Sequence, residues 1–184
     1  IYAAGSFTSV NGGTTRNYLA AIDLTTGTAT AWNPNMNSQA NVLAINGANI
    51  YVGGFFTSLN GGTVRNYIAA IDLTTGTATA WNPNLNNAVW ALMISGTTAY
   101  ASGSFTTVNG GTARYNTAAL DLTTGTATAW NPNLNSPVKA FAISGTNLYG
   151  GGQFTIVGGT TRNRLAAIDL TSGTATAWDP NINN

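Results

Sequence analysis

Histidine and cysteine are absent from this sequence of 184 residues, and charged residues make up only 6% of it. Typical soluble domains contain about 25% charged residues, so Thr, Asn, Ser and Gly supply the polarity here. A chain without cysteine forms neither disulfides nor thiolate metal sites. The net charge of +1 offers no electrostatic basis for binding nucleic acid or an anionic membrane surface. No apolar run approaches the length of about 18 residues that a membrane-spanning helix needs.

The same scarcity argues against catalysis. General acid–base chemistry needs a histidine or a pair of carboxylates, and the five acidic residues are spread along the chain. A hard-cation site takes about six to eight oxygen ligands, which single acidic residues do not supply. We therefore expect no enzyme activity and no catalytic, cofactor-binding or metal-binding residues.

What the sequence has instead is a repeat. A tryptophan recurs at Trp32, Trp81, Trp130 and Trp178, at spacings of 49, 49 and 48 residues, within one domain of four copies over 1–49, 50–98, 99–147 and 148–184. The last copy is shorter because its segment Ile156–Gly159 lacks an Asn. A fixed period of this length is typical of propellers, solenoids and repeat arrays.

Each copy contains four strand signals. In the second copy they are Ile50–Phe56, Tyr67–Leu73, Thr77–Trp81 and Val89–Ser95, and a polar loop is expected over Thr57–Asn66. The alternation of Thr and Ala before the Trp suits an outer strand, and the last strand is the most apolar. Four antiparallel strands in about 49 residues predict an all-β fold, a β-propeller of about four blades. A β-solenoid is the alternative, although its coils usually need fewer residues.

The phase of the repeat predicts an incomplete first blade. If the most apolar strand is innermost, one blade runs through Val89–Ser95, Tyr100–Phe105, Asn116–Leu122 and Thr126–Trp130. The first blade then lacks its innermost strand, and Asn181–Asn184 leads toward an inner strand that is not present. An unpaired strand edge is a template for another chain. We therefore expect either part of a longer propeller or copies that complete one another head to tail, in a ring or a filament.

The repeat also resembles a known family. The pattern Tyr51-Val52-Gly53-Gly54-x-Phe56-Thr57, then Asn60-Gly61, Arg65-Asn66-x-Ile68-Ala69, Asp72 and Gly76 is similar to the delta-sixty repeat of large bacterial and archaeal surface proteins. The resemblance covers all four copies and implies a propeller scaffold of extracellular type, with no general activity. A weaker likeness to the hairpin of quinoprotein dehydrogenase propellers spans 69–81. Nothing unique to one blade supplies the acidic calcium site and catalytic Asp of those enzymes.

Charged residues recur once per copy, whereas a catalytic pocket needs a set of groups that breaks the repeat. The Asp is expected to cap a hairpin turn, and the Arg to bond loop carbonyls or a carboxylate of a neighbouring blade. These residues are Asp23, Asp72, Asp121 and Asp169, together with Arg16, Arg65, Arg114 and Arg162. The recurring Trp is expected to pack between blades, with sugar stacking as the alternative. Trp90 is unique and is predicted to lie in the core.

Asn-rich loops offer the natural ligand face, because the two longer loops of each blade are expected to share one rim. Their carboxamides suit the hydroxyl groups of sugars, although such clusters more often satisfy their own turn. The candidates are Asn33, Asn35, Asn82, Asn84, Asn131, Asn133 and Asn181.

Two functions therefore remain open. The first is a non-enzymatic structural repeat protein that assembles with other copies or with further repeats of a longer chain. The second is a multivalent carbohydrate-binding propeller that gains affinity by avidity. The Thr- and Asn-rich composition without cysteine is typical of prokaryotic proteins outside the cell or on its surface, and self-association is the expected partnership.

Overall fold

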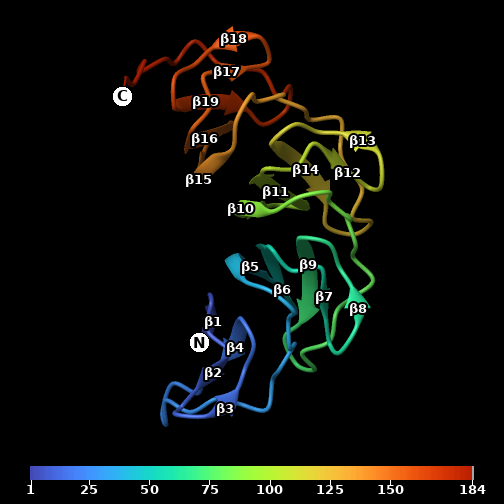
Figure 1. The fold of residues 1–184 in the computed structure, drawn as a ribbon. Helices are drawn as coiled ribbons and strands as arrows, with labels where there is room; N and C mark the ends of the chain where they lie inside the picture. Colours follow the sequence, from blue (N-terminus) through green and yellow to red (C-terminus); the bar gives the residue numbers. More distant parts are fainter. Residues whose placement is uncertain (184) are drawn as a thin grey trace.

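The computed structural model of the chain describes residues 1–183, which form four similar β units along an open crescent (Figure 1). We call these units 1 to 4 and define them as residues 1–39, 40–88, 89–137 and 138–183. Within this range the chain has no helix, so it has none that is long and apolar enough to cross a membrane. Asn184, the last residue of the segment expected to lead toward an inner strand, lies outside the described residues.

Units 2, 3 and 4 are each built on a three-stranded antiparallel sheet, whose strands follow one another in order from the concave edge outward. The three sheets are β5 (Ala40–Asn46), β6 (Asn49–Gly54) and β9 (Ile68–Asp72); β10 (Val89–Ser95), β11 (Thr98–Gly103) and β14 (Thr117–Asp121); and β15 (Val138–Ser144), β16 (Asn147–Gly152) and β19 (Leu165–Asp169). In unit 1 this sheet has two strands, β1 (Tyr2–Ala4) and β4 (Leu19–Ala21), so among the described residues the inner edge of β1 is unpaired.

The predicted polar loop contains a short hairpin that the sequence did not reveal. In unit 2 the hairpin turns at Asn60 and Gly61, which both have positive φ, the backbone region that Asn and Gly adopt most easily. The four hairpins are β2 (Ser9–Val10) with β3 (Thr14–Thr15), β7 (Ser58–Leu59) with β8 (Thr63–Val64), β12 (Thr107–Val108) with β13 (Thr112–Ala113), and β17 (Ile156–Val157) with β18 (Thr160–Thr161).

The predicted outer strand is not formed. Over 77–81 the chain makes a single β-bridge, Ala78 with Ile71, and over 126–130 the equivalent bridge joins Ala127 to Leu120. The segment makes the same single bridge in unit 4, Ala175 with Ile168, where Trp178 has no following unit within the described residues, so packing of the Trp is not what removes it from the sheet. The free edge of the segment is held by side chains instead, since Asn60 Oδ1 accepts the Ala78 N–H and Arg65 donates to the Thr79 carbonyl.

The hydrophobic core lies between neighbouring sheets. Three clusters of buried side chains fill the junctions between units 1 and 2, units 2 and 3, and units 3 and 4. Phe56, Phe105 and Phe154 are fully buried there, and burying such a side chain contributes about 1.5–3 kcal/mol. The structure is therefore held together mainly from one unit to the next, as in other repeat proteins.

Trp90 is not a core residue, contrary to the prediction from the sequence. The pairing of β10 with β11 shifts between Val89 and Ala91, and this bulge leaves Trp90 partly exposed. Its indole meets the ring of Phe55 edge-on at 4.9 Å, and Lys139 Nζ lies 4.0 Å from its centroid. Trp90 therefore belongs to a small surface cluster in which it packs against Phe55 and Lys139.

Candidate functional site

The recurring Asp residues cap hairpin turns. Asp72 Oδ1 accepts the backbone N–H groups of Thr74 and Thr75 and the hydroxyl of Thr75, at 2.9, 2.7 and 2.9 Å. Asp23, Asp121 and Asp169 make the same set of bonds in their own units. The carboxylates are thus far apart and engaged locally, and the described residues hold no group of three potential metal-binding side chains.

These turns predict how stability depends on pH. The residue three positions after each Asp donates its backbone N–H and its hydroxyl to the carboxylate. These bonds, the backbone bond first, lower the pKa of each of the four Asp carboxyls below the ordinary 3.8. Because the native pKa is depressed, the contribution to stability is complete above about pH 4 and is lost as the pH falls through the native value. Urea unfolding should give a constant free energy from about pH 7 to 5 and a decline below pH 4. The double variant Asp72→Asn/Asp121→Asn should lose less free energy of unfolding between pH 5 and 3 than the wild type. An unchanged pH dependence would contradict the Asp turns as the origin of the decline.

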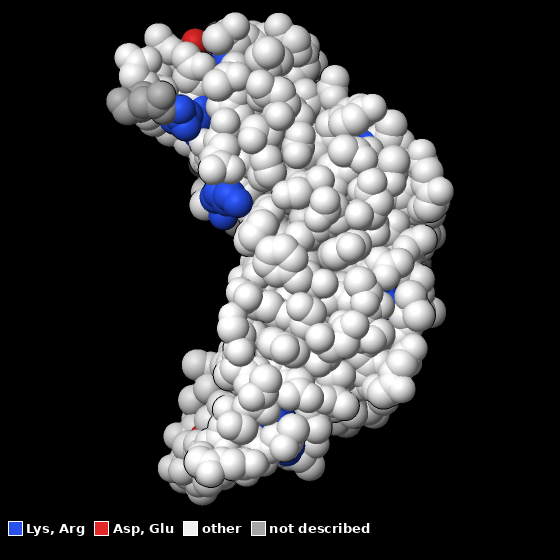
Figure 2. Space-filling view, in the orientation of Figure 1, with Lys and Arg blue, Asp and Glu red and all other residues white. Residues whose placement is uncertain are grey.

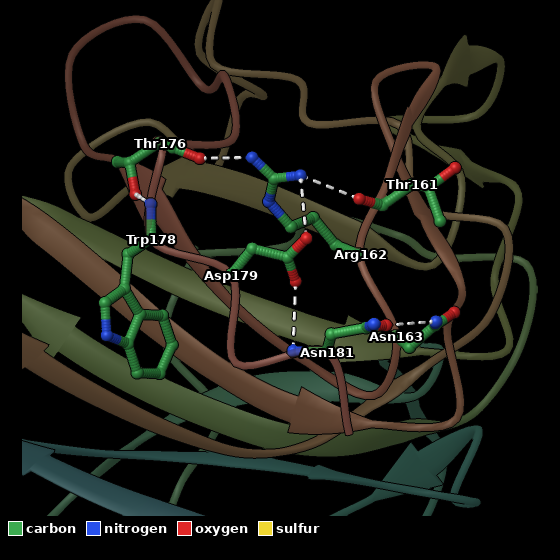
Figure 3. Close-up of polar contacts among 7 residues, drawn as sticks. All are labelled: Thr161, Arg162, Asn163, Thr176, Trp178, Asp179 and Asn181. Atoms are coloured by element: carbon green, nitrogen blue, oxygen red, sulfur yellow. Dashed lines mark hydrogen bonds and ion pairs between the residues drawn. The ribbon is translucent and has the colours of Figure 1, made fainter. Parts of the chain in front are cut away.

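The recurring Arg residues tie the hairpin of each unit to its outer segment. Arg65 donates through Nη1 to the Val64 carbonyl and through Nη2 to the Thr79 carbonyl. Arg16, Arg114 and Arg162 repeat this pattern. Arg162 also lies 3.5 Å from a carboxylate oxygen of Asp179 in its own unit (Figure 3). The guanidinium groups therefore serve the fold of their own unit, and among residues 1–183 none of them bonds a carboxylate of a neighbouring unit.

The recurring Trp joins each unit to the next. Its indole Nε1 donates to a main-chain carbonyl of the following unit: Trp32 to Asp72, Trp81 to Asp121 and Trp130 to Asp169, at 3.0, 2.9 and 2.9 Å. A glycine of the following unit lies against the indole; a Cβ on Gly76 would be 3.3 Å from Trp32 Cδ1. The three side chains are buried, so they have no surface for sugar stacking.

Trp178 breaks this pattern because no unit follows it within the described chain. Its side chain is 44% exposed and extends away from the polar network of Arg162, Asp179 and Asn181 (Figure 3). Ile182, at the position of the buried Met36, Leu85 and Leu134, is 42% exposed. At the opposite end of the crescent Leu24 is 82% exposed, whereas its equivalents Leu73, Leu122 and Leu170 pack against the clusters that contain the internal Trp residues.

The Asn-Pro-Asn loops lie against the hairpins of the next unit, and part of their polarity is used there. The backbone N–H of Asn60 donates to the Pro34 carbonyl at 2.7 Å, and Asn109 does the same to Pro83. The second Asn of each loop accepts from an Asn of its own unit at three of four positions: Asn35 from Asn17, Asn84 from Asn66 and Asn181 from Asn163. Within residues 1–183 the exposed carboxamides of Asn33, Asn82, Asn131 and Asn133 make no hydrogen bond. Only these four of the seven candidates therefore present an uncommitted amide.

One of these four lies in a hollow at the junction of units 3 and 4. The hollow has a volume of about 430 Å³, and Tyr115 and Ile156 at its border are 48% and 40% exposed. It is lined by Tyr115, Asn116, Asn133, Leu134, Asn135, Ile156 and Gly159. Sequence reasoning treated the copies as equivalent and missed this place, although the order Tyr115-Asn116 in place of Asn-Tyr was a visible signal.

Comparison with known proteins bears on the fold alone. No protein-family model and no curated protein matches the chain. It is similar to the crystal structure of the computationally designed Ika4 protein, with a TM-score of 0.51 and 17% identity over 73% of each chain. The computationally designed Ika8 protein gives a TM-score of 0.51 and 14% identity over 85% of this chain and 54% of that one. At such identities the likeness supports one conclusion: the chain has an all-β fold built from repeated antiparallel units.

Proposed function

We propose that this chain is a structural repeat protein without enzymatic activity, an arc of a β-propeller whose two end faces join further units of the same kind. Those units belong to other copies of the chain or to further repeats of a longer one. The observation that carries the proposal is the exposure of Trp178 and Ile182 at one end and of Leu24 at the other. Single exposed apolar residues are ordinary, but these three occupy positions that are covered wherever a neighbouring unit exists.

The internal junctions specify the contact expected between two chains. Placed like Trp81 against unit 3, Trp178 of one copy would donate to the Asp23 carbonyl of the next and cover its Leu24. Gly27 has a φ of +68° and open space around its Cβ position, so it would take the role of Gly76 against the indole. Ile182 would enter between the hairpin and sheet of unit 1. Such a head-to-tail contact differs on its two sides, and it produces a ring if the rotation closes and a filament if it does not.

Two further features support an architectural role. Charged residues make up only 6% of the sequence, and most of the face drawn in Figure 2 carries no charged side chain. The crescent is open on its concave side, where β5, β10 and β15 lie side by side (Figure 1). The resemblance to delta-sixty repeats and the Thr- and Asn-rich composition support a place outside the cell or on its surface.

Light scattering across a concentration series tests the assembly. The wild-type chain of 18.9 kDa should give a multiple of that mass. Leu24→Asp and Trp178→Ser should each weaken association by about 2 kcal/mol, roughly 30-fold, because each removes one side of the contact. The control Val64→Ser, at a residue 60% exposed and away from both end faces, should assemble like the wild type.

Mixing the two variants makes the test specific for a head-to-tail contact. The Leu24→Asp copy keeps an intact Trp178 face, and the Trp178→Ser copy keeps an intact Leu24 face. Their mixture should give a 1:1 dimer that grows no further, since only one productive contact is left. A wild-type chain that stays monomeric at all concentrations would contradict joining between copies of this chain, and variants that still assemble alone would contradict these end faces as the contact.

A further inference from the structure

We propose that the hollow between units 3 and 4 is a single binding site for a neutral carbohydrate. This inference concerns a side of the molecule away from the end faces and does not depend on assembly. Four departures from the repeat meet at this one place. Tyr115 stands where units 1, 2 and 4 have Asn17, Asn66 and Asn163, and Asn116 stands where units 1 and 2 have Tyr18 and Tyr67. Ile156 replaces Ser9, Ser58 and Thr107, and the hairpin of unit 4 lacks one residue beside it.

The exchange of Tyr and Asn creates the hollow. In units 1 and 2 the Tyr at positive φ packs against the core, and the preceding Asn donates to the Asn-Pro-Asn loop. In unit 3 Asn116 has the positive φ of 61° and its Nδ2 donates to the Leu134 carbonyl at 2.8 Å. A small carboxamide therefore occupies the place of a phenol ring. Tyr115 is left outside with 48% of its surface exposed.

The same exchange frees the polar groups of the site. Asn35, Asn84 and Asn181 each accept a bond from a neighbouring Asn, but Asn133 has lost that donor because Tyr115 replaces it. Its carboxamide keeps two donors and an acceptor for a ligand, and the Tyr115 hydroxyl offers one donor and two acceptors. Neither group makes a hydrogen bond within the described residues. The Asn135 carboxamide, in contrast, already donates to the Thr155 hydroxyl and accepts the backbone N–H groups of Thr155 and Ile156.

The chemistry of the lining selects the class of ligand. An exposed aromatic ring presents a rigid, apolar face at low entropic cost, which matches the C–H face of a sugar ring. The Asn133 amide and the phenol hydroxyl match ring hydroxyl groups, and Ile156 of unit 4 adds apolar surface to the lining. No charged side chain lines the hollow, so an anionic ligand would find no counter-charge. A volume of about 430 Å³ is within the usual range for small-molecule sites and suits a short oligosaccharide segment.

The test is a titration of the 184-residue chain with tetrasaccharides. Binding is monitored by calorimetry and by the NMR signals of the Tyr115 ring and the Asn133 amide. The probes are neutral tetrasaccharides of glucose, mannose, xylose and N-acetylglucosamine, with a tetrasaccharide of galacturonic acid as the charged comparison. At least one neutral probe should bind at one site per chain with a Kd of about 0.1–1 mM, as expected for a shallow site. Tyr115→Ala and Asn133→Ala should weaken binding by about 10-fold or more, whereas the matched variant Asn84→Ala should not change it.

A second variant separates binding from folding. Tyr115→Asn/Asn116→Tyr restores the order found in units 1 and 2, where Tyr18 and Tyr67 hold this position at a φ of 66°. It should fold like the wild type and lose the ligand. The proposal is overturned if no neutral probe binds at 10 mM, if only the charged probe binds, if several sites per chain are titrated, or if the double variant still binds.

Discussion

Gly103→Ala is expected to destabilise the protein by about 3 kcal/mol or more, which is a large part of the stability of an ordinary domain. A Cβ at Gly103 would lie 2.0 Å from the Ala88 carbonyl oxygen and 2.9 Å from the Val89 Cα. Both are backbone atoms that cannot move aside cheaply. The Ala88 carbonyl also accepts the N–H of Ser104 at 2.9 Å, and a methyl group would push that bond apart.

Unit 1 contains the matched control for this substitution. Gly5 holds the position of Gly103, but within residues 1–183 β1 has no inner strand beside it, and a Cβ there would meet the ring of Phe7 at 3.5 Å. Gly5→Ala should therefore change the free energy of unfolding by less than about 1 kcal/mol. Urea denaturation followed by tryptophan fluorescence compares the two variants. Equal losses for Gly5→Ala and Gly103→Ala would mean that close approach of the inner strand is not the cause.

Trp81→Ala should cost about 3–5 kcal/mol, and Trp178→Ala, at the same position of the repeat, at most about 1.5 kcal/mol. Trp81 is buried between units 2 and 3, and its removal leaves a cavity. It also takes one of two donors from the Asp121 carbonyl, which keeps the bond from the Gly125 N–H. Trp178 makes an edge-on contact with Tyr149 at 5.4 Å but has no following unit to bind. Unfolding in urea below 1 μM protein measures both values on the separate chain.

Assembly must be excluded from this comparison, because Trp178 is also the centre of the proposed contact between chains. The measurement is therefore repeated at a tenfold higher concentration. Trp81→Ala should show the same loss at both concentrations, whereas the loss for Trp178→Ala should grow with concentration as association stabilises the wild type. A large loss for Trp178→Ala at the lowest concentration would contradict the view that its partner unit lies outside this arc.

The sequence was most informative where local chemistry decides the structure. The strand Val89–Ser95 was predicted with the bounds of β10. The predicted outer strand was wrong because the alternation of Thr and Ala does not reveal that the segment pairs at one position only and that Asn60 and Arg65 bind its other edge. The closure of the arc into a propeller remains a prediction, because the described residues form an open crescent.

The candidate site was harder to predict for a related reason. Averaging the four copies gives a reliable picture of the scaffold, and it removes the differences that distinguish a site. The exchange at Tyr115 and Asn116 lies about 40 residues before Ile156 and the shorter hairpin in the sequence. Only the packing of unit 4 on unit 3 brings the two places together. Sequence reasoning recognised the missing Asn in 156–159 as a gap in the repeat but had no means to place it beside Tyr115.

That gap has a consequence for the order in which the molecule opens. Asn60 and Asn109 link their unit to the preceding one through short bonds of 2.7 and 2.6 Å, and each also binds its own outer segment. In place of these bonds unit 4 has a single longer one, in which the Gly158 N–H donates to the Asn133 carbonyl at 3.4 Å. In a chain stabilised between neighbours, local opening begins at the weakest link. Unit 4 is therefore the part that detaches first, and a ligand held between Tyr115 and Ile156 would delay its departure by binding to both sides of the seam.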